Sequence, residues 1–342
     1  MKQKYYLGID ISKSKIDCAL LNQNLEILLE QEVKNTDSSI EKFLLQMIRK
    51  HKIKADELLI CCENTGIYNR TLERVSCKME LDLWVEQALK IKRATTDFRG
   101  KDDRKDAIRI AQYAKRYEDR KVLFSESPEN ISALTHLVKA RESLLKQSNG
   151  LKNQLREAKS HDQFEYTVLS SSYKGVLQKI AKELKQIEVK IQQIANKDQA
   201  LKKNVDLIQT IPGIGKQTAI HFAIATQNFT LFKSAKHLAC YAGVVPFKNE
   251  SGTIQKKARV SKMADLKLKS LLHLAAMAAV RGNNELKEYF KRKVIEGKNK
   301  MSVLNAVRNK LVHRMMSVIQ RGEPYIIQQE IFLSKIEKTL VF

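Results

Sequence analysis

Four acidic side chains are spaced so that they could share one metal-dependent site. Asp10 follows the first apolar run of the chain, and Glu63 ends a later, more strongly apolar run. Asp103 and Asp106 stand three residues apart at the start of an expected helix, which puts both on one helix face. Such a cluster suits phosphodiester chemistry, because two Mg²⁺ ions about 4 Å apart take oxygen ligands and clamp the attacking and leaving oxygens. A single acidic residue at the end of an element is more often a surface charge or helix cap, so only the four together favour a site.

A serine among cations is a second candidate for chemistry. Ser251 precedes Gly252, and its hydroxyl could attack a phosphate while nearby cations hold the phosphate oxygens. Judged from the residues alone, a Ser-Gly pair is far more often a turn than a nucleophile. The cations that we expect to contact nucleic acid here are Lys248, Lys256, Lys257, Arg259 and Lys262.

The segment 211–219, Ile-Pro-Gly-Ile-Gly-Lys-Gln-Thr-Ala, is similar to the hairpin of a helix-hairpin-helix element. Its glycines could expose backbone N–H groups and a helix N-terminus to a phosphate, with Lys216 beside it. Such a contact would carry no base specificity. The alternative is a plain turn between two helices, in which Pro and Gly interrupt the helical backbone.

The elements that must position these residues follow from the apolar patterning. Short and alternating apolar runs predict strands over 5–9, 15–21, 25–32, 58–62 and 81–85, and helical spacing predicts helices over 38–51, 69–78 and 103–115. Three strands, a helix and a strand resemble the opening of an RNase-H-like α/β fold. We expect this domain to cover residues 1–125.

Long amphipathic helix follows the α/β domain. The apolar spacing over 126–205 predicts a helical hairpin or coiled coil, with its turn in the polar stretch between Ser160 and Tyr173. Residues 206–342 predict a third domain, mostly helical and short of strand signals. The fold class expected for the whole chain is therefore α/β plus α.

The composition points to a polyanionic partner. The 342 residues carry a formal net charge of +24 with a pI near 9.7, and 43% of them are hydrophobic. So large an excess of Lys and Arg favours nucleic acid, although a generally Lys-rich composition is the alternative. The five cysteines form no C-x-x-C pair and predict reduced core residues. No stretch approaches the roughly 18 apolar residues of a membrane span, so we expect a cytoplasmic bacterial protein that acts at the nucleoid.

Three motifs in the first half of the chain resemble one family. They are Leu7-Gly8-Ile9-Asp10, the strand ending in Glu63-Asn64-Thr65-Gly66, and the segment 100–107, Gly-Lys-Asp-Asp-Arg-Lys-Asp-Ala. They resemble the DEDD transposases of the insertion-sequence one-ten family. The resemblance implies a RuvC-like domain whose metal ligands are Asp10, Glu63, Asp103 and Asp106. The Asp-x-x-Asp-Ala spacing of the family selects Asp103 with Asp106 and leaves Asp102 as a neighbour.

The C-terminal third resembles the transposase domain of the same family. The similarity lies in the segments 232–246, 248–252 and 260–262, and it implies that Ser251 is the nucleophile. One departure is that Met263-Ala264-Asp265 stands where the family commonly has Gly-Asn. The resemblance extends from about Leu7 to a helix ending near Arg321.

The resemblance also implies a mechanism and partners. Mg²⁺, or Mn²⁺ in its place, would activate the scissile phosphate of donor and target DNA, and Ser251 would form a covalent phosphoserine linkage. A noncoding bridge RNA would pair with the DNA, and dimers would assemble into a tetramer with composite sites. Two alternatives stay open. One is a RuvC-type junction-resolving nuclease that uses the same acids with water as nucleophile, and the other is a non-catalytic nucleic-acid-binding scaffold.

Overall fold

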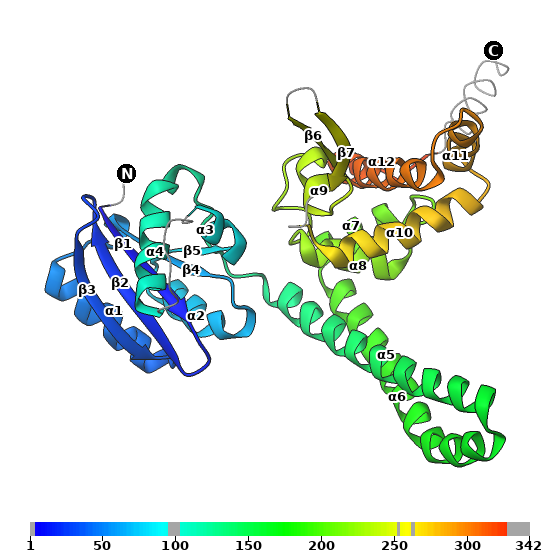
Figure 1. Ribbon diagram of the computed structural model, residues 1–342, viewed down its shortest axis with the longest axis horizontal. Coiled ribbons are helices and arrows are strands. Elements are labelled where there is room, and N and C mark those ends of the chain that lie inside the picture. The colour runs from blue at the N-terminus through cyan, green and yellow to red at the C-terminus, as the bar shows by residue number, and fades with distance from the viewer. Residues whose placement is uncertain (1–3, 95–102, 252–253, 261–263, 327–342) are drawn as a thin grey trace. The chain divides into compact units, whose positions relative to one another are not determined.

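The computed structural model describes residues 4–94, 103–251, 254–260 and 264–326, with the backbone alone at 103–104, 248–251 and 254–259. The chain divides into two compact units, Met1–Glu126 and Ser127–Phe342 (Figure 1). The first unit is a mixed α/β domain and the second is mostly helical. The expected α/β-plus-α class is confirmed at this level, and the finer division of the second unit into a hairpin and a C-terminal domain stays an interpretation.

A five-stranded sheet forms the centre of the first unit. Its strands are β1 (Tyr5–Ile11), β2 (Lys15–Asn22), β3 (Ile27–Lys34), β4 (Leu58–Glu63) and β5 (Asp82–Glu86). They lie in the order β3-β2-β1-β4-β5. The strands β1, β2 and β3 pair antiparallel, and β4 and β5 continue the sheet parallel to β1. Each predicted strand is present, displaced by at most two residues at either end.

Helices cover both faces of this sheet. The helices α1 (Asp37–His51) and α2 (Arg70–Lys78) pack on one face, where they share a core with alternate β1 residues such as Leu7 and Ile9. The helices α3 (Ala88–Ala94) and α4 (Asp103–Arg116) cover the other face, where Tyr6 points. This division follows from the period-2 alternation of side chains along a strand. Short 3₁₀ turns occupy Ala55–Glu57, Gly66–Asn69 and Glu118–Arg120.

Gly8 allows α4 to lie close against β1. A Cβ atom at this position would stand 2.1 Å from the carbonyl oxygen of Ala107 and 2.4 Å from the amide nitrogen of Ala111, both in α4. Any side chain would therefore push the helix away. The glycine sets the distance between this helix and the strand that carries Asp10.

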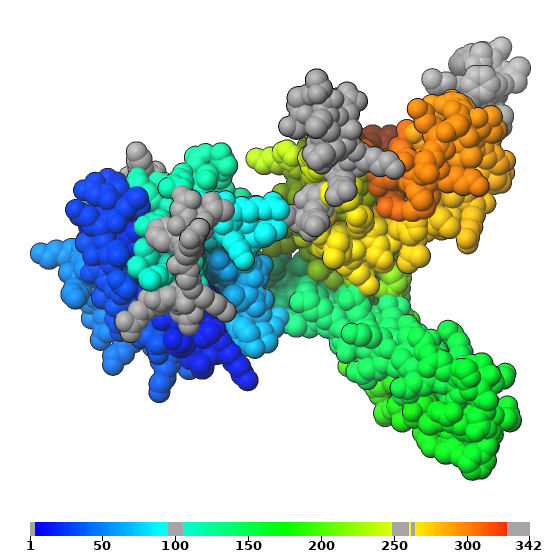
Figure 2. Space-filling model, in the orientation of Figure 1, coloured from blue at the N-terminus to red at the C-terminus, as the bar shows by residue number. Residues whose placement is uncertain are grey.

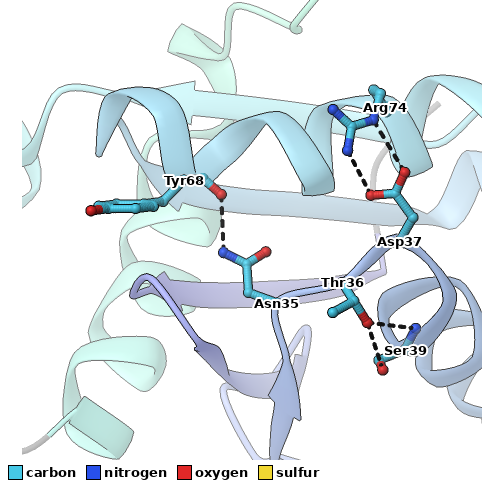
Figure 3. Close-up of polar contacts among 6 residues, drawn as sticks. All are labelled: Asn35, Thr36, Asp37, Ser39, Tyr68 and Arg74. Carbon is cyan, nitrogen blue, oxygen red and sulfur yellow. Dashed lines mark hydrogen bonds and ion pairs between the residues drawn. The ribbon is translucent and has the colours of Figure 1, made fainter.

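Polar contacts link the segment after β3 and the start of α1 to the 3₁₀ turn before α2 and to α2 itself (Figure 3). The side-chain amide of Asn35 donates to the carbonyl oxygen of Tyr68 at 3.1 Å. Thr36 caps α1, because its hydroxyl oxygen accepts from the Ser39 amide at 3.4 Å. Arg74 of α2 forms a two-bond ion pair with Asp37 of α1, at 2.7 and 3.2 Å. The Arg74–Asp37 pair thus joins α1 to α2 on the face of the sheet that both helices cover.

The second unit begins with a long helical hairpin. The helix α5 (Glu129–His161) turns at Asp162 into α6 (Gln163–Lys197), and the pair projects from the other helices of the unit (Figures 1 and 2). The carboxylate of Asp162 caps α6 by accepting from the Phe164 amide at 2.8 Å. A helical hairpin is therefore present. The turn lies in the predicted stretch between Ser160 and Tyr173, but it is shorter than expected, because helix resumes after the single residue Asp162.

Six further helices and a β-hairpin are described in the rest of the second unit. The elements are α7 (Gln199–Gln209), α8 (Lys216–Ala225), α9 (Ala235–Tyr241), β6 (Pro246–Ser251), β7 (Ile254–Val260), α10 (Leu266–Arg281), α11 (Glu285–Ile295) and α12 (Lys300–Arg321). The prediction of few strands missed β6 and β7, which pair antiparallel. Their segments mix charged and amide side chains into the alternation, which weakens the apolar signal of a strand.

Two expectations from composition concern the whole chain. Across the described ranges, no helix is long and apolar enough to cross a membrane. The five cysteines are free thiols, and Cys18, Cys61 and Cys62 are buried in the first unit. Burial raises the pKa of each of these three thiols, which keeps them protonated. They are core residues, as predicted.

Candidate active site

The β1–β4 pairing brings Asp10 and Glu63 next to each other. The two strands run parallel, and Ile9 pairs with Cys62. The next residue along each strand is acidic, and the alternation turns both carboxylates toward the α4 face of the sheet. Both side chains are partly exposed. Adjacent parallel strands thus present two carboxylates at one edge of the sheet.

Asp106 adds a third negative charge from the helix that covers this face. It lies in the first turn of α4, directly before Ala107, whose carbonyl oxygen faces Gly8 of β1. Burial raises the pKa of the Glu63 carboxyl, and the negative charges of Asp10 and Asp106 raise it further, with Lys92 opposing them. The three predicted ligands therefore influence one another electrostatically although they come from three separate elements.

The fourth predicted ligand, Asp103, is the first residue of α4 and lies one helical turn before Asp106. Its side chain lies outside the described residues. Asp106 pairs with Arg109 of the same helix at 2.5 Å. Among the side chains that the structure describes, no group of three His, Cys, Asp or Glu residues is close enough to hold a metal ion. The carboxylates are gathered in one region, but Asp10, Glu63 and Asp106 do not stand at coordinating distance.

Two more carboxylates extend this group across the sheet. Asp17 of β2 pairs with Asp10, and Glu86 of β5 pairs with Glu63. A row of four acidic residues therefore crosses four neighbouring strands. Sequence reasoning missed both flanking members, although Glu86 follows an apolar run as Glu63 does.

The flanking carboxylates have cationic partners. Asp17 is 5% exposed and lies 3.3 Å from the ammonium of Lys15. Glu86 is 6% exposed, lies 3.0 Å from the ammonium of Lys90 and accepts a hydrogen bond from the Tyr113 hydroxyl at 3.2 Å. Lys15 and Lys90 therefore offset the negative charge at the two ends of the row.

A buried amide holds the turn that starts at Glu63. Asn69 is fully buried, and its Nδ2 donates to the carbonyl oxygen of Glu63 at 2.8 Å and to Cys62 Sγ at 3.3 Å. Its Oδ1 accepts from the Thr65 amide at 2.8 Å and from the Thr65 hydroxyl. Asn69 thus fixes the backbone on which Glu63 stands. Nothing in the sequence distinguishes it from a surface helix cap.

The serine lies in the second unit at the end of a strand. Ser251 is the last residue of β6 and pairs with Ile254 of β7, so its backbone belongs to a strand. The side chains of Ser251, Lys248, Lys256, Lys257 and Arg259 lie outside the described residues, as does the whole of Lys262. Their roles stay predictions.

The departure at 263–265 has a structural counterpart. Asp265 caps α10, because its carboxylate accepts from the amides of Lys267 and Leu268 at 2.9 Å each. The Asp265 amide in turn donates to the Tyr241 carbonyl at 2.9 Å. Ala264 packs where a Cβ on Gly243 would stand, 2.5 Å away. The residues that replace the family's Gly-Asn are thus integrated into the base of the hairpin, while Met263 lies outside the described residues.

The predicted helix-hairpin-helix segment joins α7 to α8. Gly213 has a positive φ of 88°, and a Cβ there would stand 2.3 Å from the Ala275 carbonyl oxygen of α10. Close packing alone therefore explains this glycine. Gly215 precedes α8 with open space around it, and Lys216 is hydrogen-bonded to Gln192 of α6. A phosphate contact at this turn stays a prediction.

The fold and the gathered carboxylates of the first unit are compatible with a DEDD, RNase-H-like catalytic domain. Comparison with known families agrees. The family model for DEDD transposases of IS110, described as "Transposase", matches residues 7–158. A second, "Transposase IS116/IS110/IS902 family", matches residues 205–291. The two matches together cover more than half of the chain; the first extends from the α/β unit into α5, and the second lies within the second unit.

Full-length relatives are similar along nearly the whole chain. The chain is 27% identical to a "Pilin gene-inverting protein" of Moraxella bovis and to one of Moraxella lacunata, over 94% of this chain and 98% of each relative. It is 26% identical to the "Transposase for insertion sequence element IS1111A" of Coxiella burnetii, over 66% of this chain and 68% of that protein. The chain belongs to the IS110 family of transposases, and it is a DNA transposase or recombinase. The family implies a divalent cation.

Proposed function

We propose that the protein is the transposase of an insertion sequence and that it cuts and rejoins DNA through attack of Ser251 on a phosphodiester. Asp10, Glu63, Asp103 and Asp106 would hold Mg²⁺ at the edge of the sheet. The observation that carries the proposal is the crowding of negative charge around Glu63, whose pKa is raised by burial and by Asp10 and Asp106.

The donor chemistry of this region fits a hard divalent cation. Carboxylate oxygens are the ligands that Mg²⁺ prefers, and like charges held together without a counter-ion are unfavourable. The flanking Asp17 and Glu86 have cationic partners of their own, whereas the negative charges of Asp10 and Asp106 raise the pKa of Glu63. A bound Mg²⁺ would polarise the phosphoryl oxygens and offset the charge that develops on them.

The serine supplies the covalent step. Its Oγ forms a bond to phosphorus, the phosphorus–oxygen bond to one sugar breaks, and the serine proton is transferred to solvent or a base while the sugar oxygen takes up a proton. The phosphoserine ester keeps the energy of the phosphodiester. A sugar hydroxyl of another DNA end can then displace Ser251 without an external energy source.

Family membership supports assembly and guidance by RNA. We infer that copies of the chain oligomerise, as dimers and as a tetramer on DNA, and that a noncoding bridge RNA selects donor and target DNA by base pairing. In such an assembly the protein contacts phosphates and nucleic-acid shape, which suits a net charge of +24. Sequencing of the RNA that copurifies with the protein tests the guide, and absence of any enriched species rejects it.

Inversion is a second outcome of the same chemistry. The full-length match to two proteins named for inverting a pilin gene favours it. Cutting and rejoining at two sites on one DNA molecule inverts the segment between them, whereas sites on two molecules give insertion. A plasmid with two inverted element ends, analysed by polymerase chain reaction across both junctions, separates the two outcomes.

Trapping of the covalent intermediate tests the mechanism. Wild-type protein with Mg²⁺ and DNA carrying the element ends should form an adduct that survives denaturation, and Ser251→Ala should form none while still binding DNA. Full cleavage by Ser251→Ala without an adduct in the wild type would instead establish a water-using nuclease. Asp10→Ala should abolish cleavage with binding intact, whereas DNA binding without cleavage or adduct in the wild type would identify a non-catalytic binding protein.

A further inference from the structure

A buried cation in the second unit has no acidic partner among the described residues. Arg308 of α12 is 8% exposed. Its Nη2 donates to Nδ1 of His273, on α10, at 2.6 Å. Its Nε is buried without a hydrogen-bond partner in the described part of the chain. Arginine remains charged in proteins, so this guanidinium is a buried positive charge whose hydrogen bond, in the part of the chain that the structure describes, goes to a neutral ring.

Such a group is costly for a fold unless a second ion neutralises it. Burial lowers the pKa of Arg308, and burial together with the positive charge of Arg308 lowers the pKa of His273. The imidazole is therefore neutral at physiological pH and accepts the guanidinium proton at Nδ1. A buried charge without a counter-ion opposes folding. The two residues do not stabilise this unit as an ion pair would, which points to a ligand.

We propose that Arg308 and His273 bind one phosphate group of the nucleic-acid substrate. The guanidinium offers a planar fork of donors that matches two oxygens of a phosphate, and its bond to His273 occupies one of these donors. Because Nδ1 of His273 accepts, the neutral ring carries its proton on Nε2, which gives one more donor. The proposal rests on the proposed function, because a DNA-cutting protein supplies the polyanion.

The site lies beside the base of the hairpin that carries Ser251. Asn305 stands one helical turn before Arg308 on α12, and its Nδ2 donates to the Val244 carbonyl oxygen at 2.9 Å. Val244 is two residues before β6 begins at Pro246. Arg308 and Asn305 share one face of α12, and this face contacts Val244 just before β6, which we call the root of β6 (Figure 1).

The facing helix contributes a further cation. Lys269 lies one turn before His273 on α10, and its Cδ is 3.5 Å from the position of a Cβ on Gly243, the residue before Val244. Residues four apart share one face of a helix, so Lys269 and His273 present a cation and a ring donor on the same side. A phosphate bound there would be held close to the strand that ends in Ser251.

Inorganic phosphate is the probe that tests this site without DNA or metal. Melting temperature would be measured against phosphate concentration at constant ionic strength, with chloride as the replaced anion. The variants are Arg308→Gln and, as control, Arg321→Gln, which removes an exposed arginine at the end of the same helix. Wild type and Arg321→Gln should be stabilised alike, and Arg308→Gln should need roughly tenfold more phosphate or greater for the same shift.

Equal phosphate-dependent shifts in all three proteins would overturn the proposal, because they would show general attraction to a basic surface. Absence of any shift in the wild type would overturn it too. If Arg308→Gln does not fold, Arg308→Lys keeps the charge but loses the fork, and it should bind phosphate more weakly than wild type; equal binding rejects the site. The measurement needs no strand cleavage, so its failure leaves the proposed transposase chemistry standing, and the absence of a serine adduct does not alter it.

Discussion

The two units hold buried or crowded charges of opposite sign. In the first unit, Asp10 and Asp106 raise the pKa of Glu63 at the edge of a sheet. In the second unit, Arg308 is buried against a neutral histidine. Other charges in both units lie in ion pairs, such as Glu86 with Lys90 and Arg314 with Glu285. The difference indicates that one unit is prepared for a cation and the other for an anion, which are the two components of metal-assisted phosphodiester chemistry.

The largest effect is expected at Glu63, where burial and two neighbouring carboxylates disfavour the charged form. Glu63→Gln should lower strand cleavage by roughly a thousandfold, because loss of a metal ligand forfeits several kcal/mol of charge stabilisation. Glu86→Gln is the matched control on the neighbouring strand, and it should retain most activity because Glu86 is already paired with Lys90 and Tyr113. The measurement is the cleavage rate of each variant at saturating Mg²⁺. Equal loss in both variants would mean that the whole row of carboxylates acts as one site.

A second prediction concerns the glycine that sets the spacing of this site. Gly8→Ala should cost about 3 kcal/mol of unfolding free energy, because its Cβ would meet the backbone of α4 at 2.1 and 2.4 Å. Cleavage should fall as well, since Asp106 would move away from Glu63. Urea unfolding and the cleavage assay measure both effects.

The control for that change lies in the other unit. Gly175 is exposed in α6 with no atom within 4 Å of a Cβ position, so Gly175→Ala should stabilise the protein by about 0.5–1 kcal/mol. A neutral Gly8→Ala would show that α4 can shift without consequence. That result would remove the physical basis for placing Asp106 at the site.

Much of the first unit could be predicted because its signals are local. The alternation along β1 and β4 fixes which face Asp10 and Glu63 share, and helical spacing places Asp106 near a helix start. The contributions of Asp17 and Glu86 could not be predicted, because they depend on the order of strands in the sheet and on pairing between distant segments. Strand register is a tertiary property that a single strand does not encode.

The second unit shows where local signals mislead. The Ser-rich start of α6 predicts a turn, yet Ser170 and Ser171 donate to carbonyl oxygens three residues earlier and stay within the helix. The burial of Arg308 could not be foreseen either, since α12 carries other cations that are exposed or paired. Only the packing of α10 against α12 separates Arg308 from them.

A third, intermediate effect is expected at Asn69, which supports Glu63 from behind. Asn69→Ala should cost about 1–3 kcal/mol, because the Glu63 carbonyl and the Thr65 amide would be left buried without partners. Asn69→Asp keeps the acceptor for Thr65 and loses the donor to Glu63. If Asn69 positions Glu63, Asn69→Asp should raise the Mg²⁺ concentration needed for half-maximal cleavage more than it lowers the maximal rate. A fall in maximal rate alone would assign Asn69 to stability and not to the site.

The smallest effect is expected at Asp37, and its pH dependence sharpens the contrast with Glu63. Arg74 lowers the pKa of Asp37 from its usual 3.8, so this exposed pair adds stability above pH 3.8 that is lost as pH falls, and Asp37→Asn should cost less than about 1 kcal/mol at pH 7. The pKa of Glu63 is shifted in the opposite direction. Its raised pKa favours the fold below pH 4.5, and that contribution is lost as pH rises through the folded-state value.

Metal-free unfolding measured from pH 3 to 8 should therefore give two opposite trends. The wild type should gain stability relative to Asp37→Asn as pH rises, and it should lose stability relative to Glu63→Gln. Added Mg²⁺ should reverse only the second trend, because a bound cation offsets the charge on Glu63 and has no site at the Asp37–Arg74 pair. Parallel trends in the two variants would mean that cations of the fold already offset the negative charge on Glu63. The contrast between Asp37, which is paired with Arg74, and Glu63, which lies among other carboxylates, would then be wrong.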